Sequence, residues 1–169
     1  GVSSAASDVY KRQKMFDVTA IGELLIDMAQ LGVSDIGSSI FEANPGGAPC
    51  NVLAMLNKLG RSTAFIGKVG DDIFGKKLKN IVESSGTDIG GLVFDENVRT
   101  TLAFVETDEY GDRNFSFYRA PGADMMLRED EVNVDIIKQS RVLHFGTLSM
   151  THDVVEKATV KAIETAKDS

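Results

Sequence analysis

Cysteine, histidine and tryptophan are scarce in this sequence. It has one cysteine, Cys50, two histidines and no tryptophan in 169 residues. A single cysteine excludes an intrachain disulfide and a CxxC metal pair, and we interpret Cys50 as a small buried thiol in a reducing compartment. His144 stands within an apolar run and His152 has no companion at metal-ligand spacing. The sequence therefore predicts no metal site.

Positive charge and long apolar runs are also lacking. The 18 Lys and Arg residues face 25 Asp and Glu residues, which gives a net charge of −7. Nucleic acids and anionic membranes bind basic patches, so neither is expected as a partner. No apolar run reaches the ~18 residues that suggest a transmembrane helix, and the first residues lack the apolar stretch of a secretory leader. A cytoplasmic protein is expected.

The first 14 residues differ from the rest of the chain. Residues 1–14 show almost no apolar periodicity, whereas the segment from Met15 begins abruptly as an apolar strand. We interpret residues 1–14 as a non-native or disordered extension. Residues 15–169 have the length of one ordinary globular domain, and 43% hydrophobic residues are typical of a soluble fold.

Apolar strand-like runs alternate with amphipathic segments along much of residues 15–169. Each run is short, and each amphipathic segment repeats its apolar residues at helical spacing. Alternating strands and helices predict an α/β fold with a mainly parallel sheet. Predicted strands span 16–21, 62–67 and 141–145, and predicted helices span 49–59, 72–85, about 128–139 and 153–167.

Two further segments interrupt the α/β alternation. Residues 100–107 and 113–119 are β-type runs on either side of a turn-rich spacer, which predicts a hairpin. Residues 31–41 are rich in glycine and serine, so we expect short strands at best there. Flap strands near 28–43 and 100–119 are expected to lie apart from the main sheet, as a lid or a dimerisation flap.

A glycine pair precedes the first predicted helix. In NPGGAPCN, Gly46 and Gly47 permit close approach of a ligand to the backbone, and Asn51 adds a side-chain donor and acceptor. A tight turn into the helix explains the glycines equally well. No GxxxxGK[ST] and no GxGxxG after the first strand occur, which excludes the two common phosphate-binding loops.

Three other residues are candidates for a polar ligand site. Asp27 follows the first strand, where ligands bind in open α/β sheets, although an ordinary turn aspartate also fits. Phe117 and Arg119 lie on one face of the hairpin's second strand. Arg119 either reaches an oxygen-rich ligand or is a solvated surface group. Asp71 or Asp72 is interpreted as a helix cap.

Taken together, these segments resemble the ribokinase-like (PfkB-type) carbohydrate kinases and, within them, the fructokinases. The matching stretches are GELLID, NPGGAPCNVLAMLNKLG, FIGKVGDDIFG, TTLAFVE, FYRAPGADMML and VLHFGTLSM. Leu53 departs from the pattern, because the family usually has a small residue there. The resemblance implies a ribokinase-like, doubly wound, mainly parallel sheet with a small β-hairpin lid, truncated in this chain.

The resemblance also implies an activity and a division of roles. An intact parent would transfer the γ-phosphate of ATP, with Mg²⁺, to a primary hydroxyl of a sugar. Asp27, Gly46, Gly47, Asn51, Phe117 and Arg119 would bind the sugar. The family's catalytic base and most of its nucleotide site belong to a C-terminal half that this chain lacks, so no catalytic residue is expected here and the fragment alone should be inactive.

Several alternatives stay open at this point. Within the same family, the substrate is 2-keto-3-deoxygluconate or ribose instead of fructose; Phe117 lacks a tyrosine's hydroxyl, which favours a neutral ketose. A non-catalytic sugar-binding module is the alternative from another class. The partners expected are a small sugar and a second copy of the parent, which would dimerise through the flap.

Overall fold

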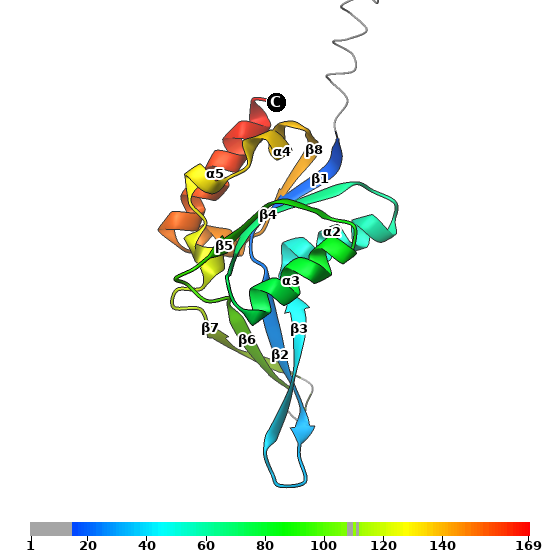
Figure 1. Ribbon diagram of the computed structural model, residues 1–169, viewed down its shortest axis with the longest axis vertical. Coiled ribbons are helices and arrows are strands. Elements are labelled where there is room, and N and C mark those ends of the chain that lie inside the picture. The colour runs from blue at the N-terminus through cyan, green and yellow to red at the C-terminus, as the bar shows by residue number, and fades with distance from the viewer. Residues whose placement is uncertain (1–14, 108–109, 111) are drawn as a thin grey trace, which may run out of the picture.

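The computed structural model describes residues 15–107, 110 and 112–169. Two sheets, each with four strands, account for all the strands of these residues (Figure 1). The strands are β1 (Phe16–Ile21), β2 (Leu25–Val33), β3 (Ser39–Gly46), β4 (Thr63–Gly70), β5 (Asp88–Asp95), β6 (Leu102–Thr107), β7 (Arg113–Tyr118) and β8 (Ser140–Phe145). The helices are α2 (Ala48–Lys58), α3 (Ile73–Ser84), α4 (Val134–Lys138) and α5 (Asp153–Lys167), with 3-10 turns η1 (Ala123–Met126), η2 (Glu129–Glu131) and η3 (Thr147–Met150).

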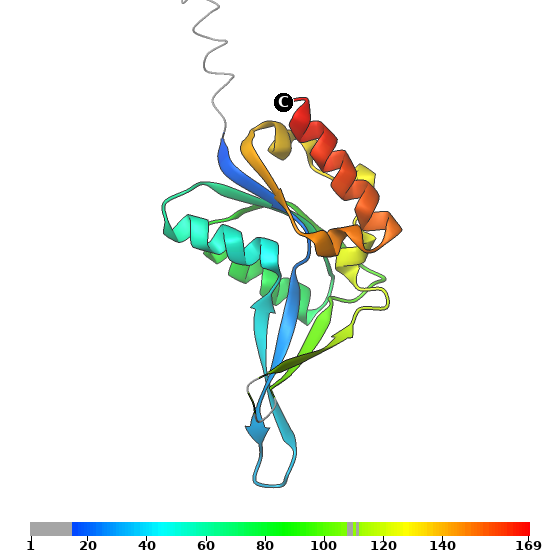
Figure 2. The same ribbon diagram turned by 180° about the vertical axis from the view of Figure 1, so that it is seen from behind.

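The first sheet has the order β5-β4-β1-β8, and all its strand pairs are parallel. Helices lie on both faces, with α2 and α3 on one side and α4 and α5 on the other (Figures 1 and 2). The predicted doubly wound α/β fold is therefore confirmed.

Alternating side chains of β4 divide the core into two clusters. Ile66 packs with Val155 and Ala158 of α5, whereas Phe65 packs with Leu53 of α2 and Leu78 of α3. Side chains of a strand point to opposite faces in turn, and every residue of β4 is buried. The strand thus holds the helices of both faces.

The second sheet has the order β3-β2-β6-β7. It projects from the end of the parallel sheet at which β1 finishes (Figures 1 and 2). Its central pair, β2 with β6, is parallel, and the outer pairs are antiparallel. The hairpin expected at 100–119 contributes β6 and β7, outside the parallel sheet. The strands around 31–41 are longer than expected, because β2 and β3 pair along most of their length around the turn at Gly37.

Two elements differ from the predictions. Strand β5 was not predicted, because Gly90 and Gly91 weaken the strand pattern of DIGGLVFD. A Cβ at Gly91 would lie 2.8 Å from the Phe65 carbonyl oxygen, so glycine is needed where β5 meets β4. The helix expected near 128–139 is instead divided into η2 and α4. The division falls at Asn133, which begins a new helix by accepting a hydrogen bond from the Ile136 N–H.

Other local predictions are confirmed. Helix α5 has the predicted bounds, and the Asp72 carboxylate caps α3 by accepting from the N–H groups of Phe74 and Gly75. A cap that was not predicted is His152, whose Nδ1 atom accepts a hydrogen bond from the Val154 N–H at the start of α5. Within the described residues, no helix combines the length and the apolar character that crossing a membrane requires. The interpretation of residues 1–14 lies outside the described residues.

Candidate functional site

One row of the second sheet carries two of the six predicted site residues, Asp27 and Phe117. The strand register aligns Asn44 on β3, Asp27 on β2, Ala103 on β6 and Phe117 on β7. Directly opposed residues of neighbouring strands project to the same face of a sheet. Asp27 and Phe117 therefore share one face, separated by the small side chain of Ala103.

The Asp27 carboxylate has no hydrogen-bond partner among the described residues. It is half-buried and accepts no hydrogen bond from the residues that the structure describes. Burial raises the pKa of Asp27 above its ordinary value. A carboxylate that loses water without gaining donors is unfavourable on its own and suited to accept hydrogen bonds from a ligand.

Gly46 and Gly47 are both required by close contacts. A Cβ at Gly46 would collide with the carboxylate of Asp27, so glycine lets that carboxylate lie against the backbone. Gly47 has a φ of 118°, and a Cβ there would collide with the main-chain oxygen of Glu23. Any larger residue at either position would therefore collide with its surroundings. The same turn places its backbone beside Asp27.

Asn51 is not brought into the row of Asp27. It lies in the first turn of α2, exposed, with its N–H donating to the Gly47 carbonyl oxygen at 3.1 Å. Its side chain lines a cavity of about 80 Å³ toward α3, which has an otherwise mostly apolar lining. A contact between Asn51 and a sugar stays a prediction. The cavity is lined by Leu24, Pro45, Gly46, Cys50, Asn51, Ala54, Ile81, Val82 and Ser85.

Phe117 presents an open aromatic surface. Its side chain stacks on Phe115 with ring centroids 6.1 Å apart, and the two residues are 52% and 54% exposed. An aromatic face is a suitable cover for the C–H surface of a sugar ring. The position of Phe117 on the Asp27 face agrees with the predicted role without testing it.

Arg119 has a partner within the chain. Its Nε and Nη2 atoms lie 2.8 and 2.7 Å from the Asp124 Oδ2 atom. Asp124 also accepts a hydrogen bond from the Thr101 hydroxyl. The Asp124 side chain is 1% exposed and that of Arg119 is 10% exposed. The guanidinium expected to reach a ligand is therefore neutralised by a buried carboxylate, and its contact with a sugar stays a prediction.

The Asp124 cluster, defined as Asp124, Arg119 and Thr101, joins the second sheet to the rest of the molecule. Thr101 immediately precedes β6, Arg119 immediately follows β7, and Asp124 belongs to η1. Both ends of the β6–β7 hairpin are thereby tied to one buried carboxylate. The cluster fixes where the hairpin leaves the body.

Besides Asp124, two more buried charged residues were missed by sequence reasoning. Lys68, at the end of β4, lies 3.0 Å from Asp95 Oδ2 and 2.9 Å from Glu131 Oε1. Glu23, just after β1, is 6% exposed. Each of them interrupts an apolar run of the sequence, Lys68 in AFIGKVG and Glu23 in AIGELLI. A charged residue in such a run is a signal of a buried charge, which needs a partner.

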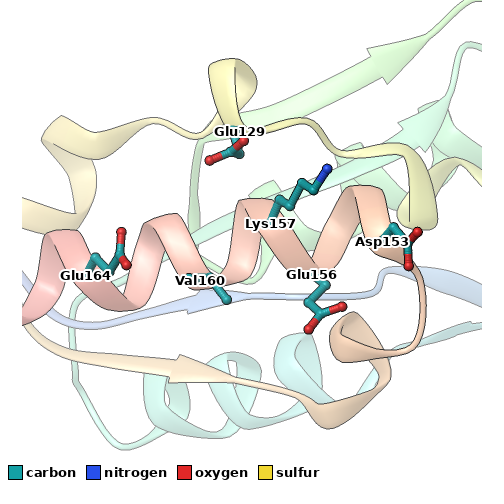
Figure 3. Close-up of a pocket in the computed structure, with 6 residues that line it drawn as sticks. All are labelled: Glu129, Asp153, Glu156, Lys157, Val160 and Glu164. Carbon is teal, nitrogen blue, oxygen red and sulfur yellow. The ribbon is translucent and has the colours of Figure 1, made fainter.

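A larger hollow, of about 400 Å³, lies along α5 (Figure 3). Its lining includes four carboxylates and one lysine, and this excess of negative charge does not suit a phosphate. Within the described residues, no group of three or more His, Cys, Asp or Glu side chains is placed to hold a metal ion. The row of Asp27 remains the candidate site. The hollow is lined by Glu129, Asp153, Glu156, Lys157, Val160 and Glu164.

Comparison with known proteins agrees with this fold. The model of the pfkB family carbohydrate kinases matches residues 15–169, and the chain belongs to that family. A probable fructokinase-5 of Arabidopsis thaliana is 46% identical over 154 residues, which cover 90% of this chain and 48% of that protein.

Solved structures share the fold. The crystal structure of a fructokinase from Xylella fastidiosa has a TM-score of 0.85 at 31% identity and covers 91% of this chain and 48% of that one. A putative ribokinase II from E. coli, solved in complex with ATP and Mg²⁺, has a TM-score of 0.82 at 27% identity over 91% of this chain and 50% of that one. The chain spans about half the length of these relatives.

Proposed function

We propose that the protein containing this chain is an ATP-dependent fructokinase and that the chain supplies its sugar-binding half. The observation that carries the proposal is the unpartnered Asp27 carboxylate beside the Gly46–Gly47 turn, on a face shared with Phe117. Fructokinases 46% and 45% identical to this chain support the choice of sugar.

The chain's own residues have binding roles in this proposal. Asp27 accepts hydrogen bonds from sugar hydroxyls, the turn at Gly46 and Gly47 lets the sugar approach the backbone, and Phe117 covers it. Contacts of Asn51 and Arg119 with the sugar belong to the same proposal, on the strength of the family resemblance alone. These contacts orient a primary hydroxyl for attack.

Phosphoryl transfer needs groups that the described residues do not assemble. ATP brings the phosphate, and Mg²⁺ offsets its charge in such reactions. Following the family resemblance, we assign ATP, Mg²⁺ and the catalytic base to the part of the protein outside this chain. Residues 15–169 alone are expected to transfer no phosphate.

A neutral ketose fits better than a sugar acid. The acid 2-keto-3-deoxygluconate would need a free cation for its carboxylate, whereas Arg119 is paired with Asp124. Phe117 has no hydroxyl to add a hydrogen bond. Ribose is the alternative neutral sugar in the same family, and a non-catalytic sugar-binding module is the alternative of another class.

Two further parts of the proposal concern assembly and location. Leu31 and Ile36 of the β2–β3 hairpin are 65% and 89% exposed. Exposed apolar side chains on a projecting sheet favour pairing with a second copy, so we propose a homodimer through this sheet. We place the protein in the cytoplasm, where its lone cysteine stays reduced.

The test is ATP consumption by the full-length protein with fructose, ribose or 2-keto-3-deoxygluconate. The proposal expects turnover that depends on sugar and is fastest with fructose. Turnover fastest with another sugar would replace fructose as the substrate, and sugar binding without any turnover would favour the binding module.

A further inference from the structure

Glu23 is a buried acidic residue with no assigned role. It follows β1 at the carboxyl edge of the parallel sheet and is 6% exposed. Burial of a carboxylate is costly unless each oxygen finds a donor. A residue kept at that cost is more readily explained by a site than by stability.

Glu23 holds the glycine turn from two sides. Its Oε1 atom accepts a hydrogen bond from the Ala48 N–H at 3.0 Å, at the first residue of α2. Its main-chain oxygen lies where a Cβ of Gly47 would be, so the turn packs directly on Glu23. The negative charge also suits the N-terminus of a helix.

The second oxygen of Glu23 faces another loop. Among the described residues, Glu23 Oε2 is the only buried side-chain nitrogen or oxygen atom without a hydrogen-bond partner. A Cβ at Gly146, which follows β8, would lie 3.2 Å from it. One side chain therefore hydrogen-bonds to the start of α2 and lies beside the loop after β8.

We propose that Glu23 is a positioning residue of the sugar site. Glu23 fixes the Gly46–Gly47 turn through its hydrogen bond with Ala48. The turn then confines the Asp27 carboxylate, because Gly46 lies against that carboxylate. Glu23 does not touch the sugar. The expected effect on sugar binding rests on the proposed function. The positioning of the turn by Glu23 rests only on the contacts within this chain.

The test compares Glu23→Ala with Glu23→Gln in the full-length protein. Glutamine keeps an oxygen that can accept from Ala48, whereas alanine removes it. For Glu23→Ala we expect the KM for sugar to rise at least about tenfold, with kcat and the KM for ATP within about threefold of wild type. Glu23→Gln should restore the KM for sugar to within about threefold. Glu96→Ala, at an exposed position, is the control.

Amide hydrogen exchange at Ala48 provides a readout without activity. Protection should fall in Glu23→Ala and persist in Glu23→Gln. The inference is overturned if protection is equal in all variants, if glutamine is as impaired as alanine, or if the constants for both substrates change together with thermal stability. Wild-type turnover is measured first, so that a protein inactive on every sugar refutes the proposed function, while the Ala48 exchange still decides the contact.

Discussion

The two sheets differ in how completely the chain covers them. All of β4 in the parallel sheet is buried, between helices on both faces. In the second sheet, Phe115 and Phe117 are exposed and Asp27 has no hydrogen-bond partner among the described residues. The centre of the parallel sheet is a packed core, although Val142 and Phe145 of its edge strand β8 are exposed. The second sheet presents apolar and acidic groups to something outside it. Mutations in the two sheets should therefore differ in how much stability they remove.

The largest expected effect is on the packed sheet. Phe65→Ala should lower the free energy of unfolding by about 4 kcal/mol, because the side chain of Phe65 in β4 is fully buried against α2 and α3. Phe117→Ala should cost less than about 1 kcal/mol, since the ring is half-exposed. Urea titrations of both variants in the full-length protein measure the difference; equal losses would contradict the contrast between the sheets.

The next effect concerns the junction between the sheets. Asp124→Ala should destabilise the protein by about 3 kcal/mol, because it leaves the Arg119 guanidinium and the Thr101 hydroxyl without their buried partner. Asp130→Ala, which removes an exposed ion pair with Arg128, should cost no more than about 0.5 kcal/mol. Thermal unfolding separates the two, and similar shifts in Tm would argue against a buried junction.

Asp27 should affect sugar use and stability in opposite directions. Asp27→Ala removes charge-assisted hydrogen bonds worth about 2–3 kcal/mol, so kcat/KM for the sugar should fall roughly 30- to 150-fold. Burial raises the pKa of Asp27, so its ionised form opposes folding at neutral pH, and this opposition disappears as pH falls through the raised pKa. The variant should therefore be no less stable than wild type at pH 7. An unchanged kcat/KM would refute the role.

The smallest effect belongs to the cap of α3. Burial alone would raise the pKa of Asp72, but hydrogen bonds from Thr100, Gly75 and Phe74 lower it below its ordinary value. A lowered pKa gives stability that is present above the unfolded-state pKa and is lost as pH falls through the folded-state pKa. Asp72→Ala should cost about 1 kcal/mol at pH 7. Wild type and variant should converge in acid; a gap that persists there would contradict this cause.

Local patterns in the sequence predicted the body of the fold well. The bounds of β1 and α5 agree with their apolar periodicity, and the cap at Asp72 follows from its place before a helical pattern. Strand β5 was missed because its glycines depend on contact with β4, which no local pattern records. The length of β2 and β3 likewise comes from their mutual pairing.

Prediction of the site was less complete, for a related reason. Asp27, Gly46 and Gly47 stand beside recognisable strand and helix ends, and the structure does place them together. The pairing of Arg119 with Asp124 depends on how the chain turns after β7. The contact of Glu23 with Ala48 joins residues 25 positions apart. Such contacts between distant segments are set by tertiary packing, not by local periodicity.

The most direct test of the central claim is a crystal structure of the full-length protein with fructose. Our account predicts the sugar on the face shared by Asp27 and Phe117, with its hydroxyls within hydrogen-bond distance, about 2.5–3.0 Å, of the Asp27 carboxylate. A sugar bound elsewhere, such as in the acidic hollow along α5, with Asp27 left without a ligand, would contradict it.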